Sequence, residues 1–72
     1  MTKNTTITKR IKELKETAQK EIDTCRVMIG FYEKEASKHE NPKEKSEILL
    51  KVQKIKGSLI FNDAFLEYLN TL

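Results

Sequence analysis

The sequence predicts an all-α protein: an antiparallel hairpin of two long helices that dimerises into a four-helix bundle. Apolar residues recur every three or four positions along most of the 72 residues, which is the period of a helix. An Asn-Pro pair interrupts this pattern, and the half that follows carries apolar residues on two opposite faces. Two Gly, one Pro, no Trp and 35% charged residues are typical of long, surface-rich helices.

The first helix is expected from about residue 6 to about residue 39. Residues 1–5 are polar, so we expect a frayed N-terminus in which Asn4, Thr5 or Thr6 caps the helix. Gly30 lies inside the helix, and we interpret it as a close approach of the packed helix, with a kink as the alternative. The apolar stripe that defines this helix is Ile7, Ile11, Leu14, Ala18, Ile22, Cys25, Ile29, Tyr32, Ala36 and His39.

Residues 40–42 are expected to form the interhelical turn. Asn41 suits an N-cap, Pro42 suits the first helical position because it lacks an N–H, and Glu44 stands where a capping-box carboxylate reaches back. The second helix should therefore run from about residue 42 to about residue 70. Because the connection is short, the helices must pack antiparallel, which sets Tyr32 near Leu50.

The distribution of charge agrees with this topology. Residues 1–20 hold six Lys or Arg and two Glu, a net +4, whereas residues 58–72 hold only two acidic residues, a net −2. Residues 21–42 have a net charge of −2 and residues 43–57 a net charge of +3. An antiparallel hairpin places opposite signs side by side, although each exposed pair contributes only about 0–1 kcal/mol.

The second helix carries two apolar stripes. The first stripe, expected to face the first helix, is Ile48, Val52, Ile55, Leu59, Leu66 and Leu69. The second stripe, roughly 180° away on a helical wheel, is Leu50, Phe61, Phe65, Tyr68 and Leu72. The alternative is a helix break at Gly57-Ser58, which would give a three-helix bundle that buries the second stripe internally. The first stripe continues in phase across Gly57, which favours one continuous helix.

A helix that is apolar on both sides must be covered on both sides, so the second stripe predicts a partner. Val27 and Phe31 of the first helix also project away from the hairpin seam. Burying one such side chain contributes about 1.5–3 kcal/mol. The predicted protein interface, for a homodimer or for a protein partner of another kind, is Val27, Phe31, Leu50, Phe61, Phe65, Tyr68 and Leu72.

Catalytic chemistry is not expected. His39 and Cys25 are the only residues of their types and lie about 21 Å apart along one helix, so they cannot form a dyad within one chain. We interpret Cys25 as a small buried hydrophobe and His39 as a helix-terminal residue near the last carbonyls. Gly-rich phosphate loops and paired-cysteine motifs are absent from the sequence. We therefore predict a non-enzyme with no catalytic residue, metal, cofactor or small-molecule substrate.

Nucleic-acid binding is the competing hypothesis. The isoelectric point is near 9.1, and the basic cluster Lys9, Arg10, Lys12 and Lys15 could contact phosphates. However, the net charge is only +3, and the aromatic residues of the second stripe lie in an acidic segment. A stacking platform for bases needs aromatic residues among basic ones.

The sequence contains no apolar run near the 18 residues of a membrane span and none at its start that resembles a signal peptide, so we expect a soluble, cytoplasmic protein. Residues 1–72 should form a single helical domain. We expect a stoichiometric adaptor or inhibitor of a larger protein complex. A composition rich in Lys, Glu, Ile and Asn suggests an AT-rich genome, which fits a phage- or plasmid-encoded regulator.

Overall fold

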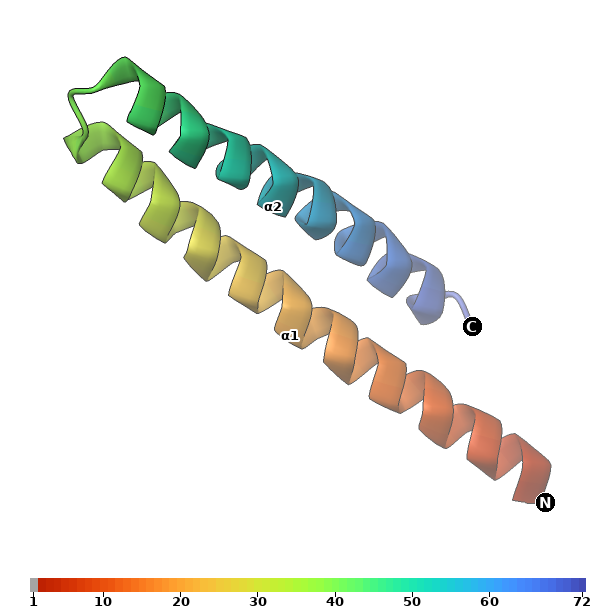
Figure 1. Cartoon of the computed structure of the whole chain (residues 1–72). Coiled ribbons are helices and arrows are strands. Elements are labelled where there is room, and N and C mark those ends of the chain that lie inside the picture. The colour runs from red at the N-terminus through yellow and green to blue at the C-terminus, as the bar shows by residue number, and fades with distance from the viewer. Residues whose placement is uncertain (1) are drawn as a thin grey trace.

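Two long helices lie side by side in the computed structural model, which describes the backbone of residues 2–72 and the side chains of residues 5–72. Helix α1 spans Thr2–Lys38 and helix α2 spans Pro42–Asn70. They run antiparallel and are joined by a short connection (Figure 1). The molecule is a rod of 61 × 14 × 13 Å, and residues 2–72 contain no strand. The predicted all-α helical hairpin is confirmed.

Helix α1 begins earlier than predicted. Its first residue is Thr2, so Asn4, Thr5 and Thr6 lie inside the helix and none of them is its N-cap. Met1, which belongs to the segment expected to fray, lies outside the described residues. The earlier start has a simple cause. Thr and Asn cost only a few tenths of a kcal/mol in a helix, and extending an existing helix adds one hydrogen bond per residue.

The connection between the helices contains the predicted N-cap. Asn41 has an extended backbone, with φ −74° and ψ 117°. Its side-chain oxygen accepts hydrogen bonds from the backbone N–H groups of Lys43 at 2.9 Å and Glu44 at 3.4 Å. Pro42 is the first helical residue, so the turn comprises residues 39–41 rather than 40–42.

Glu44 and His39 close the turn in a way that the sequence did not predict. Oε2 of Glu44 lies 3.1 Å from Nδ1 of His39, where a protonated nitrogen donates to the carboxylate. The ring of His39 therefore contacts the first turn of α2, and only its backbone N–H bonds to α1, at the carbonyl of Ala36. The interpretation of His39 as a side-chain cap on α1 is corrected: it bridges the two helices.

The Asn41 cap should contribute measurably to stability. Changing Asn41→Ala removes the acceptor of two helix N–H groups, and we expect a loss of about 1 kcal/mol. For a chain of this size that corresponds to a melting temperature lower by about 4–8 °C, which thermal circular dichroism can measure. Asn41→Asp, which keeps an acceptor, is the control and should melt close to the wild type. An alanine variant as stable as the wild type would contradict the assignment.

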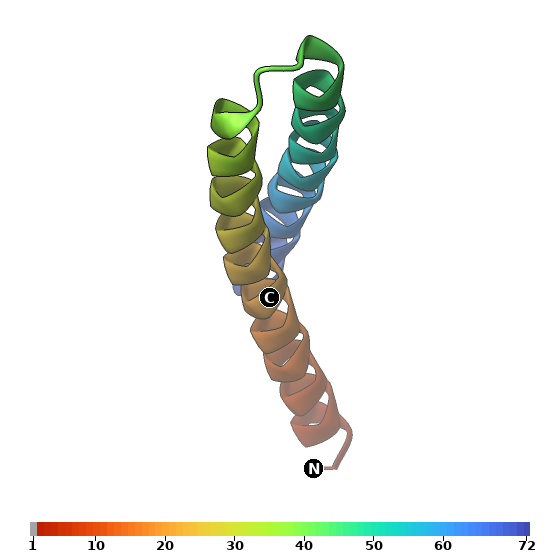
Figure 2. The same cartoon turned by 60° about the vertical axis from the view of Figure 1, so that its left-hand side comes forward.

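The core is a single seam between the two helices. Its buried members are Ala18, Ile22, Cys25, Ala36, Val52 and Leu69. The other first-stripe residues of α2 are partly buried, so that stripe faces α1 as predicted. Cys25 is a buried free thiol, as expected of a small hydrophobe. The seam repeats every seven residues, a period typical of left-handed coiled coils, and α2 passes gradually across α1 (Figure 2).

Two residues that were assigned to the seam are exposed instead. Ile7 lies at the unpaired end of α1, and Leu14 stands at the edge of the interface. Lys15 is partly buried in place of Leu14, because it lies one heptad before the buried Ile22 and so shares its direction. On α2, the partly buried Asn62 occupies the corresponding seam position between two apolar residues. Its amide donates to the carbonyl of Ser58 at 2.8 Å, within the same helix.

At each glycine, the structure contradicts one of the interpretations drawn from the sequence. Helix α2 is continuous through Gly57, so the three-helix bundle is wrong. The close approach expected at Gly30 is also wrong, because Gly30 is exposed and a Cβ added there would meet no heavy atom within 4 Å. The same space is open at Gly57, and neither glycine has a positive φ. Both positions can therefore accept alanine.

Gly30→Ala and Gly57→Ala should each stabilise the protein by up to about 1 kcal/mol, because alanine loses less backbone entropy in a helix. The added methyl groups meet no obstacle. Urea unfolding followed by circular dichroism measures the gain, and the double variant should show the sum of the two. A loss of stability at Gly57 would contradict the continuous helix α2.

Candidate protein interface

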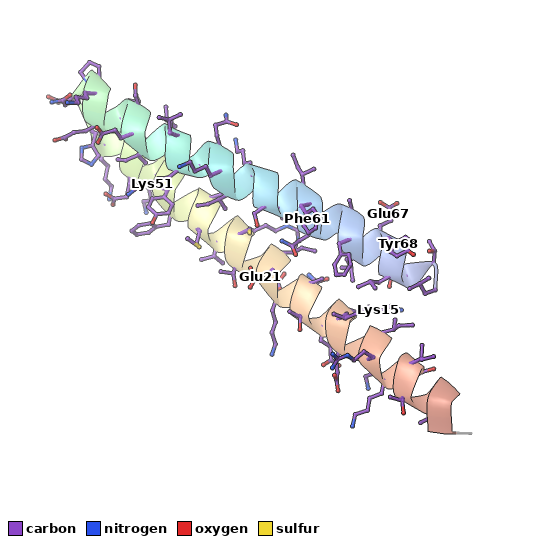
Figure 3. The ribbon with its side chains drawn as sticks, turned by 45° about the vertical axis from the view of Figure 1, so that its right-hand side comes forward. Lys15, Glu21, Lys51, Phe61, Glu67 and Tyr68 are labelled. Atoms are coloured by element: carbon purple, nitrogen blue, oxygen red, sulfur yellow. The ribbon has the colours of Figure 1, made fainter. Side chains whose placement is uncertain are left out.

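An aromatic strip follows the outward face of α2 over its last three turns. The strip residues are spaced by four, three and four: Phe61, Phe65, Tyr68 and Leu72. Phe61 is 67% exposed, Tyr68 and Leu72 are similarly exposed, and Phe65 is partly buried. The rings of Phe61 and Phe65 stack, with centroids 6.2 Å apart and planes 11° apart. Phe61 and Tyr68 both lie on the half of α2 that leads to the C-terminus (Figure 3).

Two contacts across the seam define the two sides of the hairpin. On one side, Nζ of Lys51 lies 5.8 Å from the centre of the Tyr32 ring. On the other, Nζ of Lys56 lies 3.7 Å from Oε2 of Glu33. We call these the Tyr32 side and the Glu33 side. The Lys51–Tyr32 contact also agrees with the prediction that Tyr32 lies near Leu50.

The strip on α2 turns toward the Tyr32 side. Phe65 follows Lys51 by two heptads, so it shares its direction along a helix whose seam repeats every seven residues. Leu72 follows the last helical residue, Asn70, by two positions and ends the strip. Ile60 lies one turn after Lys56 and therefore belongs to the Glu33 side, where it is 69% exposed.

Helix α1 contributes to the same surface. Met28 lies one turn before Tyr32, and Leu14 and Ile7 precede Met28 by two and three heptads, which places them on the Tyr32 side. Leu14 and Ile7 are exposed near the end where the termini lie. We call the combined surface the open-end patch: Ile7, Leu14, Phe61, Phe65, Tyr68 and Leu72.

Ile7 and Leu14 were not predicted as interface residues. Their position beside the strip depends on how far α1 extends past the end of α2, which the sequence pattern does not give directly. Helix α1 has 37 residues and α2 has 29, so α1 is eight residues longer, about 12 Å. Figures 1 and 2 both show α1 continuing past the C-terminal end of α2. We call this stretch of α1, residues 2–9, which extends past the end of α2, the overhang. The difference between the two predicted helix lengths was the available signal.

The other three predicted interface residues lie elsewhere. Leu50 is exposed on the outward face of α2 near the turn, beside the exposed residues Lys51 and Lys54. Val27 is exposed on the outward face of α1, whereas Phe31 is exposed beside Tyr32, on the Tyr32 side but in the turn half of the hairpin. The structure therefore does not bring these three residues together with the open-end patch. Phe31 instead packs its edge against Tyr32, with ring centroids 5.5 Å apart.

The basic cluster does not form a single face. Lys9, Arg10, Lys12 and Lys15 are spaced so that their directions spread around α1, and Lys15 turns toward the seam. A row of phosphates needs cations that converge on one side, so this arrangement is a poor nucleic-acid footprint. A shallow hollow on α1 is lined by Thr5, Thr8, Lys9 and Lys12.

The described part of the chain offers few other features for a site. Within it, no three His, Cys, Asp or Glu side chains gather where they could share a metal ion. Neither of the described helices is long and apolar enough to cross a membrane. Comparisons with protein-family models, curated proteins and solved structures find no match for this chain.

Proposed function

We propose that the protein is a small non-catalytic interaction module that self-associates through the open-end patch into a four-helix bundle. It acts by stoichiometric binding, as an adaptor or inhibitor of a larger protein complex. The observation that carries this proposal is the stacked pair Phe61 and Phe65 on an outward helix face. Aromatic side chains gain most from burial at an interface, and large exposed apolar patches mark interaction sites.

The exposed area of the chain supports self-association. A compact monomer of 8.4 kDa exposes about 4,600 Å². The hairpin exposes 5926 Å², which is about 1,300 Å² more. A stable interface buries about 800 Å² on each partner. The excess area is therefore sufficient for a stable dimer, in which each copy supplies the second layer of helices that the other lacks.

A dimer formed through the open-end patch leaves other apolar residues accessible. Val27 on the outward face of α1 and Phe31 in the turn half of the Tyr32 side would remain exposed, at 72% and 60%, where they can contact a different protein. A small chain that binds in this way fits the class of phage- or plasmid-encoded regulators that block or recruit a larger complex.

The mass in solution tests the proposal directly. We expect sedimentation or light scattering to show a species of twice 8.4 kDa that dissociates on dilution. This mass should change little between low and high salt, because the interface is mainly apolar. A chain that stays a monomer at every concentration would contradict self-association. Binding to duplex DNA that weakens steeply with salt would favour the nucleic-acid hypothesis instead.

A further inference from the structure

We infer that the open-end patch is covered by the overhang of a second copy of this chain, with the two hairpins antiparallel and their open ends overlapping. The two turns then lie at the far ends of the dimer. This inference rests on the proposed self-association and adds the orientation and the segment that makes the contact. It replaces the four-helix bundle with a shorter overlap, because each cross-section of the contact then holds α1 and α2 of one copy and only α1 of the other.

The dimensions of the two elements match. The overhang extends about 12 Å beyond α2, as the difference in helix lengths requires. The strip from Phe65 to Leu72 covers seven residue steps, or about 10 Å of helix. If a two-fold axis passes near the end of α2, the overhang of each copy lies along this strip of the other. Ile7 would then lie beside Tyr68 of the partner copy.

The distribution of apolar residues favours overlap at the open end. On the Tyr32 side, six apolar residues lie in residues 7–14 or 61–72, the segments nearest the termini, whereas the turn half of that side exposes Met28 and Phe31. The turn half of the outward face of α2 carries Glu47, Lys51 and Lys54, all exposed, with Leu50 among them. Parallel stacking of two hairpins along their whole length would bury these charges, which is costly for unpaired ions.

The net charges of the two segments are opposite. The overhang contains Lys3 and Lys9 and no acidic residue, whereas residues 58–72 contain Asp63 and Glu67 and no basic residue. Asp63 and Glu67 follow Lys56 and Ile60 by one heptad, so they lie on the Glu33 side and not in the strip. The opposite charges therefore attract the two segments at long range, while the contact itself is apolar. A two-fold interface of this kind is self-complementary, because one copy supplies both halves of the contact.

Distances between spin labels in the dimer test this orientation. Lys45 lies near the turn and Asn70 near the open end, and both are exposed and outside the open-end patch. Lys45→Cys and Asn70→Cys are each made in a Cys25→Ala background whose mass is first shown to match the wild type. We expect the turn labels to be more than one hairpin length, 61 Å, apart. The Asn70→Cys labels should be within about 30 Å, because packed helices lie only 8–10 Å apart.

Each other pattern of distances overturns the inference. Turn labels within about 30 Å of each other would indicate parallel hairpins. Antiparallel hairpins that overlap completely would give a different pattern. The labels at both sites would be more than about 30 Å apart, and the turn labels would be only one hairpin length apart. In both cases the mass would still be that of a dimer, so the proposed function would stand. A monomeric wild type would instead overturn the proposed function and this arrangement together.

Discussion

Replacing Phe61 and Phe65 together with serine should convert the dimer into a folded monomer. Phe61 is mostly exposed and Phe65 only partly buried in the single hairpin, so the seam should survive the change. Each aromatic side chain contributes about 1.5–3 kcal/mol when buried, and a dimer loses four of them. We expect the dissociation constant of the dimer to rise by at least about a hundredfold. Sedimentation should show half the mass, and circular dichroism should show retained helix.

The matched control is Ile60→Ser. Ile60 is adjacent to Phe61 and equally exposed, at 69% against 67%, but lies on the Glu33 side of the hairpin. It should leave the mass unchanged. A double serine variant that stays folded with the wild-type mass would exclude the aromatic strip as the dimer contact. An effect of the same size from Ile60→Ser would place the contact on the opposite edge of α2.

Ile22→Ala should cause the largest loss of stability of any single substitution in the seam. Ile22 is 1% exposed and lies at the centre of a core formed by one layer of side chains between two helices. Truncating a buried isoleucine costs about 2–5 kcal/mol. A domain of this length has a total stability of only about 4–11 kcal/mol. We therefore expect the melting temperature, measured at one fixed protein concentration, to fall by more than about 10 °C.

Val27→Ala provides the comparison for this prediction. It removes apolar atoms from the same helix, five residues after Ile22, at a position that is 72% exposed. The expected change is within about 0.5 kcal/mol. Equal effects from Ile22→Ala and Val27→Ala would mean that the seam does not face α2 as the structure places it.

Local sequence signals were sufficient where the physics is local. Asn41 and Pro42 predicted the start of α2 because the cap uses atoms only two or three residues away. The three-to-four residue period predicted the seam, and with it the burial of Ile22 and Val52. The aromatic strip was also predicted correctly as a second, outward face of α2.

Local signals failed where the answer depended on a distant part of the chain. At Gly57-Ser58 the sequence left a helix break open as the alternative, although the in-phase first stripe correctly favoured one continuous helix. Gly30 was expected to touch α2, but it lies on an exposed face. His39 was assigned to the last carbonyls of α1, but its ring contacts Glu44 across the turn.

Two helices, their antiparallel order and most residues of the seam were predictable from the sequence, because periodicity, capping and a short connection are properties of neighbouring residues. Which surface residues share a side depends on how the two helices pack. The contacts Lys51–Tyr32 and Lys56–Glu33 fix how the two helices are rotated about their axes. That rotation, together with the overhang of α1, joins Ile7 and Leu14 to the aromatic strip and turns Val27 away from it. Phe31 shares the Tyr32 side with the strip but lies in the turn half of the hairpin. Neither the rotation of the helices nor the length of the overhang can be predicted from one helix alone.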